Sequence, residues 1–301
     1  MQDANDPKGT VKCARWAHLN EIDPIGSAGS YEHYVLLEWP LPWPRDFRDV
    51  AELAALQDFA DSQGARLQAL VPSARGDRRM TVFSRDHPFS GYRRAEGEVK
   101  DSPESTAVAL VAQNAHFAAR SPSEVLICTH GQRDRCCGSL GMALHKKLEA
   151  MPADTGLVHS RRTSHMGGHR FAPTALVFPE GTAWAFMNPQ LLSAITSRTG
   201  PIDAALPYYR GCTGLDSGRQ QALERAVLRE VGWDMLDSAR WGEDLGATTL
   251  LHVKSSHGQT SSWEADVHIG REVKVPDCGG TVANATKTES ELVVSGLRQL
   301  A

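Results

Sequence analysis

The sequence lacks the marks of several common protein classes. It has no block of lysine and arginine, and its 32 basic residues nearly balance its 36 acidic residues, which leaves a net charge of -4. It also lacks a long apolar run, because prolines and glycines interrupt its least charged region, residues 171–197. Binding to nucleic acid or to a membrane, and a membrane-spanning helix, are therefore not expected.

Residues 1–8 lack the basic and apolar regions of a signal peptide, so we expect a cytoplasmic protein. Cysteine is scarce as well, and six cysteines in 301 residues are too few for a disulfide scaffold. In a reducing compartment these residues would remain thiols or bind metal. They are Cys13, Cys128, Cys136, Cys137, Cys212 and Cys278.

Familiar catalytic motifs are also missing. The C-x-x-C motif of thiol oxidoreductases is absent, and the adjacent Cys136 and Cys137 could form a disulfide only with strain. A C-x5-R phosphatase loop is absent, since Asp134 stands six residues after Cys128. Glycoside hydrolysis needs two carboxylates across one site, and no such cluster stands out. A thiol-based oxidoreductase remains an alternative interpretation.

The first hundred residues predict a β-α-β-β unit. A strand is expected over residues 31–38, and a helix over residues 49–63, where apolar residues recur with a period near 3.6. Gly64 ends this helix, and residues 66–71 and 79–83 then read as short strands.

The central region predicts the same order with longer elements. After a helix over residues 105–119, an apolar strand over residues 124–129 carries Cys128 at its end. The later elements are a helix over 138–150, a strand over 157–161, a hairpin of 175–178 with 182–187, and a helix capped by Asn188 that runs through Ile195. This order resembles the thioredoxin arrangement, so we predict an α/β fold.

The C-terminal region predicts a helix over residues 218–237, a hairpin of strands 247–254 and 262–269, and a polar, loosely held tail after Asp277. Three regions are therefore expected. They are the N-terminal β-α-β-β region 1–104, the thioredoxin-like domain 105–200 and the C-terminal extension 201–301.

Two thiols and two imidazoles in the central region form a candidate metal-binding set. Cys128 ends a buried strand, and the pair Cys136-Cys137 precedes a predicted helix whose dipole lowers the pKa of a thiol. His165 and His169 flank Met-Gly-Gly, so a loop bent by glycine must place them together. Soft thiolates and imidazoles suit either zinc or an iron–sulfur cluster. The C-x7-C or C-x8-C spacing exceeds that of zinc fingers, but a structural zinc site remains an alternative.

Residues 128–138, CTHGQRDRCCG, and residues 165–173, HMGGHRFAP, resemble the sucrase/ferredoxin-like family. Weaker resemblance extends to residues 39–44, WPLPWP, and to residues 209–211 together with Gln220, Glu224, Gly232 and Trp233. The resemblance implies a thioredoxin-like [2Fe-2S] ferredoxin domain with two histidine ligands. Carried over residue by residue, it implies Cys128, Cys137, His165 and His169 as ligands, with Cys136 as the alternative to Cys137.

This ligand set implies a one-electron carrier. Two neutral imidazoles in place of thiolates make a cluster less negative, which raises its reduction potential and permits coupled proton uptake. A flavin- or ferredoxin-dependent reductase is the expected electron donor, and an oxygenase or metal-reducing system is the expected acceptor. The residues expected to surround the ligands, as supports or as a docking surface for an acidic partner, are His130, Arg133, Arg135 and Arg170.

Overall fold

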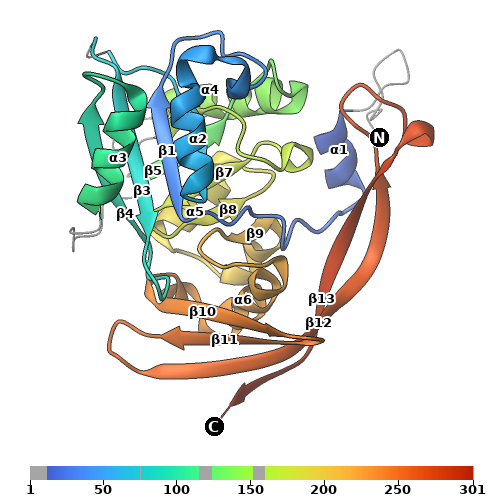
Figure 1. The fold of residues 1–301 in the computed structure, drawn as a ribbon. Coiled ribbons are helices and arrows are strands. Elements are labelled where there is room, and N and C mark those ends of the chain that lie inside the picture. The colour runs from blue at the N-terminus through green and yellow to red at the C-terminus, as the bar shows by residue number, and fades with distance from the viewer. Residues whose placement is uncertain (1–11, 75, 115–123, 152–159, 301) are drawn as a thin grey trace.

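The computed structural model describes residues 12–74, 76–114, 124–151 and 160–300. These residues form a nine-stranded mixed sheet with helices on it, and a separate four-stranded antiparallel sheet below (Figure 1). The large sheet has the strand order β4-β3-β1-β2-β6-β5-β7-β8-β9. The α/β class predicted from the sequence is confirmed.

The N-terminal half of the large sheet has a thioredoxin-like strand order. Strand β1 (His33–Glu38) pairs in parallel with β2 (Ala65–Leu70) and antiparallel with β3 (Arg79–Arg85), which pairs in turn with β4 (Tyr92–Glu98). The predicted helix starts later than expected, at Ala54, because two short 3-10 turns precede α2 (Ala54–Ser62). Strand β4 was not predicted.

The second half repeats this topology. Strand β5 (Glu124–Cys128) pairs in parallel with β6 (Ser160–Thr163) and antiparallel with β7 (Ala175–Phe178), which is followed by β8 (Thr182–Trp184). The two halves join where Leu70 of β2 pairs with Thr163 of β6. The thioredoxin-like order predicted for the central region is therefore consistent with the structure.

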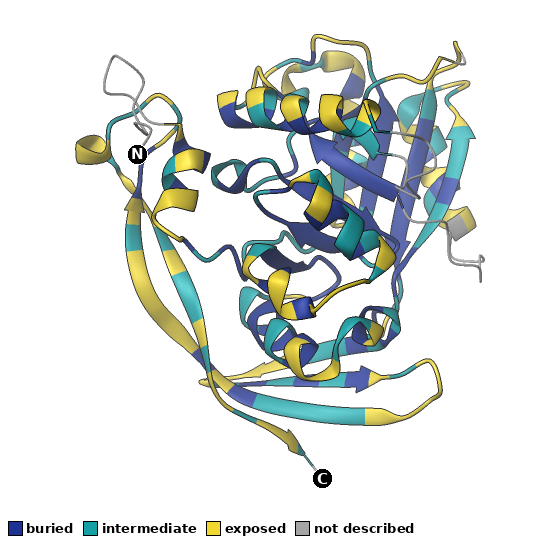
Figure 2. Cartoon of the chain, turned by 180° about the vertical axis from the view of Figure 1, so that it is seen from behind, coloured by how far each residue is buried: buried dark blue, intermediate teal, exposed yellow. Residues whose placement is uncertain are grey.

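Helices cover the sheet, and most of its strands are buried, whereas β4 and β6 are largely half-buried (Figure 2). Helices α2 and α3 (Pro103–Asn114) enclose an apolar cluster with β1, β3 and β4. Helix α4 (Met142–Glu149) contacts both β6 and α5 (Pro189–Ser197), whose first turn is capped by the Asn188 side chain as predicted. None of the described helices is long and apolar enough to cross a bilayer.

Two predicted elements of the central region extend beyond the described residues. The structure covers residues 103–114 of the first helix, and residues 115–119 lie outside the description. Likewise, residues 157–159 of the predicted strand lie outside it, and β6 begins at Ser160. The domain boundaries at residues 104 and 200 stay predictions, although α3 packs on β3 and β4 of the first half.

The C-terminal region forms its own sheet beside α6 (Gly218–Val231) and the edge strand β9 (Tyr209–Cys212). Its strands are β10 (Ala239–Leu245), β11 (Thr248–Lys254), β12 (Thr260–Val275) and β13 (Lys287–Leu300). The prediction of a loosely held tail after Asp277 is wrong. Strand β13 pairs with β12 over nearly its whole length, and its half-buried Leu292, Val294 and Leu297 pack against the main apolar core.

The long β12–β13 hairpin reaches from the C-terminal sheet to the N-terminal helix α1 (Cys13–Leu19) (Figure 1). A small apolar cluster fixes this contact. It combines Ala17 and Ile22 near α1, Phe171 and Ala185 of the second half, and Val275 at the end of β12. The connection between β12 and β13 is thereby held beside both α1 and the second half of the large sheet.

Candidate metal centre

Cys128 is placed by a fully buried strand. All five residues of β5 are buried, and hydrogen bonds to both β6 and β7 hold this strand in the interior of the sheet. The Cys128 amide donates to the carbonyl oxygen of Thr174 at 3.3 Å. The thiol thus lies at the carboxyl end of a central strand, where α/β folds usually carry their chemistry.

Cys137 is brought to Cys128 by a π-helical turn over residues 137–141, which precedes α4. The turn packs against the end of β5 so closely that a Cβ on Gly141 would lie 1.9 Å from the carbonyl oxygen of Cys128. A Cβ on Gly138 would lie 2.4 Å from the Cα of Gly131. Glycine is required at both positions because the backbone itself fills the space.

The histidine loop bends at glycines, as the sequence predicts. Gly167 and Gly168 have φ values of 86° and 70°, in the left-handed region that favours glycine. A Cβ on Gly168 would lie 2.4 Å from the guanidinium carbon of Arg210. The loop is held at its start by His130, whose Nδ1 accepts from the amide of His165 at 3.3 Å.

Cys128, Cys137 and His165 form what we call the first thiol group. One ligand atom from each residue lies within 4.8 Å of the other two. Hydrogen bonds from Cys137 and from His165 lower the pKa of Cys128 well below that of an ordinary thiol, although burial opposes this effect. The hydrogen bond to Cys128 and burial raise the pKa of Cys137. The group therefore favours one thiolate beside a neutral thiol.

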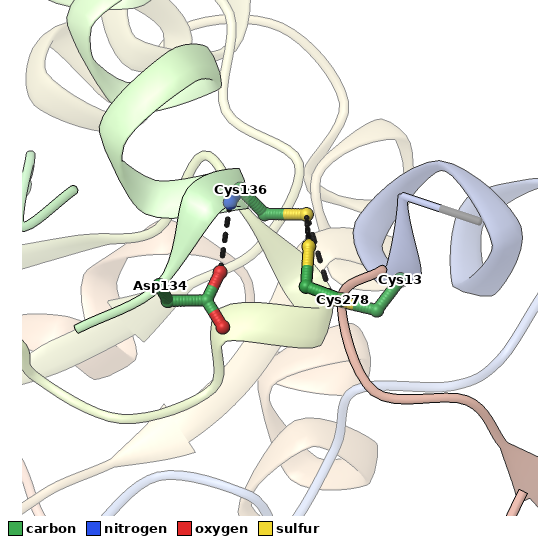
Figure 3. A group of neighbouring side chains, drawn as sticks. All are labelled: Cys13, Asp134, Cys136 and Cys278. Carbon is green, nitrogen blue, oxygen red and sulfur yellow. Dashed lines mark hydrogen bonds between the residues drawn. The ribbon is translucent and has the colours of Figure 1, made fainter. Parts of the chain in front are cut away.

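Cys13, Asp134, Cys136 and Cys278 form the second thiol group (Figure 3). Its four ligand atoms also lie within 4.8 Å of one another. The sulfur of Cys136 is 2.8 Å from that of Cys278 and 3.4 Å from that of Cys13. Hydrogen bonds from Cys13 and Cys136 lower the pKa of Cys278 to about 2.

His169 lies between the two groups. Its Nδ1 is 2.8 Å from a carboxylate oxygen of Asp134 and 3.4 Å from the sulfur of Cys13. Its ring centre is 6.2 Å from that of His165. The structure therefore brings together three of the four predicted ligands, whereas the fourth, His169, contacts Asp134 and Cys13 of the second group. It separates the adjacent thiols, with Cys137 in the first group and Cys136 in the second.

Arg210 is a buried cation beside the first thiol group. Its guanidinium donates to the hydroxyl and carbonyl oxygens of Ser27 at 3.0 and 2.6 Å, and to the carbonyl oxygen of Gly167 at 3.4 Å. Burial lowers the pKa of Arg210 to about 10, and the nearby sulfurs of Cys137 and Cys128 act in the opposite direction. Arg210 thus supplies a positive charge that stabilises negative charge at Cys128 and Cys137.

Of the residues expected around the ligands, His130 and two arginines have structural partners. His130 Nε2 donates to the carbonyl oxygen of Pro44 at 2.9 Å, so its ring links the proline-rich segment to the histidine loop. Arg133 pairs with Asp46 at 2.9 Å, and Arg170 pairs with Glu289. Arg170 also connects the site to β13.

A cleft of about 670 Å³ opens over both thiol groups. Its walls combine His165, His169 and Cys278 with four basic residues and with the acidic Asp134 and Asp277, so basic side chains outnumber acidic ones on the side from which solvent and a partner protein could reach the site. These basic residues are Arg45, Arg133, Arg135 and Lys287.

The sequence alone does not indicate the roles of Cys13, Cys278 and Arg210. Cys13 and Cys278 lie far outside the central motif and match no ligand spacing, and only the folded contact between α1 and the β12–β13 connection joins them. The available signal was the residue type, because cysteine is a common ligand. Arg210 belongs to the segment over residues 209–211, which resembles the family, but nothing in the sequence of this segment indicates that Arg210 lies beside the thiols.

Comparison with known families decides the relationship. A sequence model of the sucrase/ferredoxin-like family matches residues 24–211, more than half of the chain. The chain belongs to the sucrase/ferredoxin-like family. The match covers both halves of the large sheet and includes the first thiol group, whereas Cys13 and Cys278 lie outside it. Neither the curated proteins nor the solved structures include a match to the chain.

Proposed function

We propose that this chain is a one-electron carrier that holds a [2Fe-2S] cluster through Cys128, Cys137, His165 and His169. The observation that supports it most is the first thiol group, where two buried thiols and an imidazole converge within 4.8 Å. Membership of the sucrase/ferredoxin-like family agrees with the proposal. When bound, the cluster would accept and release a single electron.

The donor set fits such a cluster chemically. Among the described contacts, His165 Nδ1 is buried without a hydrogen-bond partner, as expected of an atom that awaits a ligand or a proton acceptor. Asp134 lies at Nδ1 of His169, which leaves Nε2 as the free nitrogen. Histidines that bind metal commonly donate their other N–H to a carboxylate in this way.

The surrounding residues would tune and expose the centre. Two neutral imidazoles raise the reduction potential above that of an all-cysteine cluster, and the buried charge of Arg210 acts in the same direction. The basic rim of the cleft suits an acidic surface on a reductase or on an acceptor protein. His165 and His169 line this cleft, so proton exchange with solvent could accompany electron transfer.

The test is spectroscopy of the full chain purified without oxygen. We expect a red-brown protein that contains iron and inorganic sulfide in equal amounts, and an EPR signal that appears after reduction with dithionite. The control is Cys212→Ser, because Cys212 belongs to neither thiol group and this variant should keep the spectrum. Material without iron and sulfide after anaerobic reconstitution would end the proposal.

A single zinc ion in the first thiol group is the second candidate. It is favoured by the compact spacing, because one ion can satisfy three donor atoms within 4.8 Å. A zinc protein would be colourless and would have no EPR signal after reduction. Zinc that is lost in Cys128→Ser, together with the absence of iron, would establish this alternative.

A further inference from the structure

We propose that the second thiol group is a separate metal site that binds one zinc ion through Cys13, Cys136 and Cys278, with Asp134 as the fourth ligand. The inference does not depend on the electron-carrier proposal. It uses three thiols that the proposed cluster does not need.

The convergence of the three sulfurs is the first argument. Cys13 comes from α1, Cys136 from the loop after β5, and Cys278 from the connection between β12 and β13 (Figure 3). Cys13 and Cys136 are only 1% and 0% exposed. Three sequence-distant segments thus direct half of the chain's cysteines to one point.

The carboxylate of Asp134 completes a set of four donors. One of its oxygens accepts from the amide of Cys136 at 2.8 Å, and the other lies 2.8 Å from His169 Nδ1. These contacts hold the carboxylate beside the sulfurs, all within 4.8 Å. Zinc takes cysteine and aspartate ligands, and structural zinc sites have four protein donors in a tetrahedron.

A disulfide explains the group less well. The sulfurs of Cys136 and Cys278 are 2.8 Å apart, whereas a disulfide bond is about 2.05 Å long. A disulfide between these two residues would also leave the third thiol, Cys13, without a partner in the bond. A divalent ion gives all four donors a partner and offsets the negative charge of the thiolates.

The site would link α1 and the β12–β13 connection to the central region of the chain. Helix α1 has only seven residues and lacks a side-chain hydrogen bond at its N-cap, so it depends on tertiary contacts. Bound zinc would link this helix and the β12–β13 connection to the loop that carries Cys137.

The experiment measures zinc and iron in the full chain after loading with zinc sulfate. We expect one zinc ion per chain in the wild type, and zinc at the level of the buffer blank in Cys13→Ser and Cys278→Ser. Iron content and the visible spectrum should be unchanged in both variants. Cys212→Ser is the matched control and should keep its zinc. Asp134→Asn should weaken zinc binding by about tenfold or more in a competition with a chelator.

A second measurement works without any variant, in case a serine substitution prevents folding. In the zinc-loaded wild type, alkylation followed by peptide mapping should find the half-buried Cys278, which lines the cleft, protected, and chelation should make it reactive. Zinc absent from the wild type, zinc retained in both serine variants, or a disulfide between Cys136 and Cys278 would each overturn the proposal. Zinc and iron are counted separately, and Cys128→Ser identifies any zinc held by the first thiol group, so the failure of one proposal is distinguishable from the failure of the other.

Discussion

Cys136 and Cys137 are neighbours in the sequence, yet their thiols enter different groups. The first thiol group is local, because its members lie within residues 128–165 and all come from one half of the large sheet. The second spans the chain from Cys13 to Cys278. The difference agrees with the two tasks that we propose, a redox centre in the local group and structural support in the group that joins distant segments.

The two groups share one pattern of thiol pKa shifts. In each group, one thiol has a strongly lowered pKa because it accepts hydrogen bonds from neighbouring thiols, whose own pKa is raised. The donor thiols are Cys137 in the first group and Cys13 and Cys136 in the second. The accepting thiol is Cys128 in the first group and Cys278 in the second. The groups differ in the remaining candidate ligand, which is the neutral imidazole of His165 in one group and the carboxylate of Asp134 in the other. A neutral imidazole ligand adds no negative charge to a metal centre and so raises its reduction potential, whereas a carboxylate ligand adds negative charge.

The largest expected effect is a loss of metal when either of the adjacent Cys136 and Cys137 is replaced by serine. Cys137→Ser should lose its iron and its visible absorbance, because this thiol belongs to the first group. Cys136→Ser should keep both and lose zinc. Metal analysis of the two purified variants checks this prediction. Loss of iron in Cys136→Ser with iron retained in Cys137→Ser would reverse the assignment.

A change of ligand type in the first group should shift the reduction potential. His165→Cys replaces a neutral donor by a thiolate, so we expect the midpoint potential to fall by up to a few hundred mV, of the order that separates Rieske centres from all-cysteine clusters. Protein-film voltammetry measures this shift. An unchanged potential in a variant that still contains the cluster would exclude histidine ligation at this position.

A substitution at Gly141 should disturb the packing of the π turn on β5, which brings Cys137 to Cys128, without changing a proposed ligand. Gly141→Ala places a methyl group 1.9 Å from the carbonyl oxygen of Cys128, so we expect a loss of roughly 1–3 kcal/mol in the free energy of unfolding and a lower iron content. Denaturant titration and iron analysis measure both effects.

Gly131→Ala is the matched control in the same loop. Its Cβ would lie 3.4 Å from the Cα of Gly138, which is ordinary contact, and its backbone is outside the left-handed region. We expect nearly unchanged stability and full iron content. Equal losses in the two variants would contradict the argument from packing.

The smallest effect is expected at Arg210. Arg210→Met removes a buried positive charge near Cys128 and Cys137, so the midpoint potential should fall, but by less than in His165→Cys. Arg210→Lys keeps the charge and should retain most of the wild-type potential. Zinc content should not change in either variant, because Arg210 contacts the histidine loop rather than the second group.

Much of the fold could be predicted from local patterns. Apolar runs identified β1 and β5, and the helix period and the capping side chain of Asn188 identified α2 and α5. Strand β13 was missed because its alternation is weak, and only pairing with β12 makes its polar residues compatible with a strand. The π turn at residues 137–141 was predicted as part of a regular helix, since sequence period cannot reveal how closely it packs on β5.

The candidate site was predictable only where its residues are close in sequence. The cysteine motif and the H-x3-H motif indicated Cys128, His165 and His169 and left Cys136 and Cys137 open, and the family resemblance implied Cys137. The fold brings Cys128, Cys137 and His165 together. The partners of Cys136 could not be inferred, because α1 and the β12–β13 connection meet only in the folded chain. The contact between His169 and Asp134 likewise depends on the loop conformation.

The most direct test of the electron-carrier account is pulsed EPR of the dithionite-reduced protein, grown with histidine that carries the heavy nitrogen isotope. The account predicts a signal from one reduced two-iron cluster with couplings to two histidine nitrogens, and His169→Cys should remove one of them. A cluster signal without nitrogen coupling, or no cluster signal in iron-loaded protein, would contradict it.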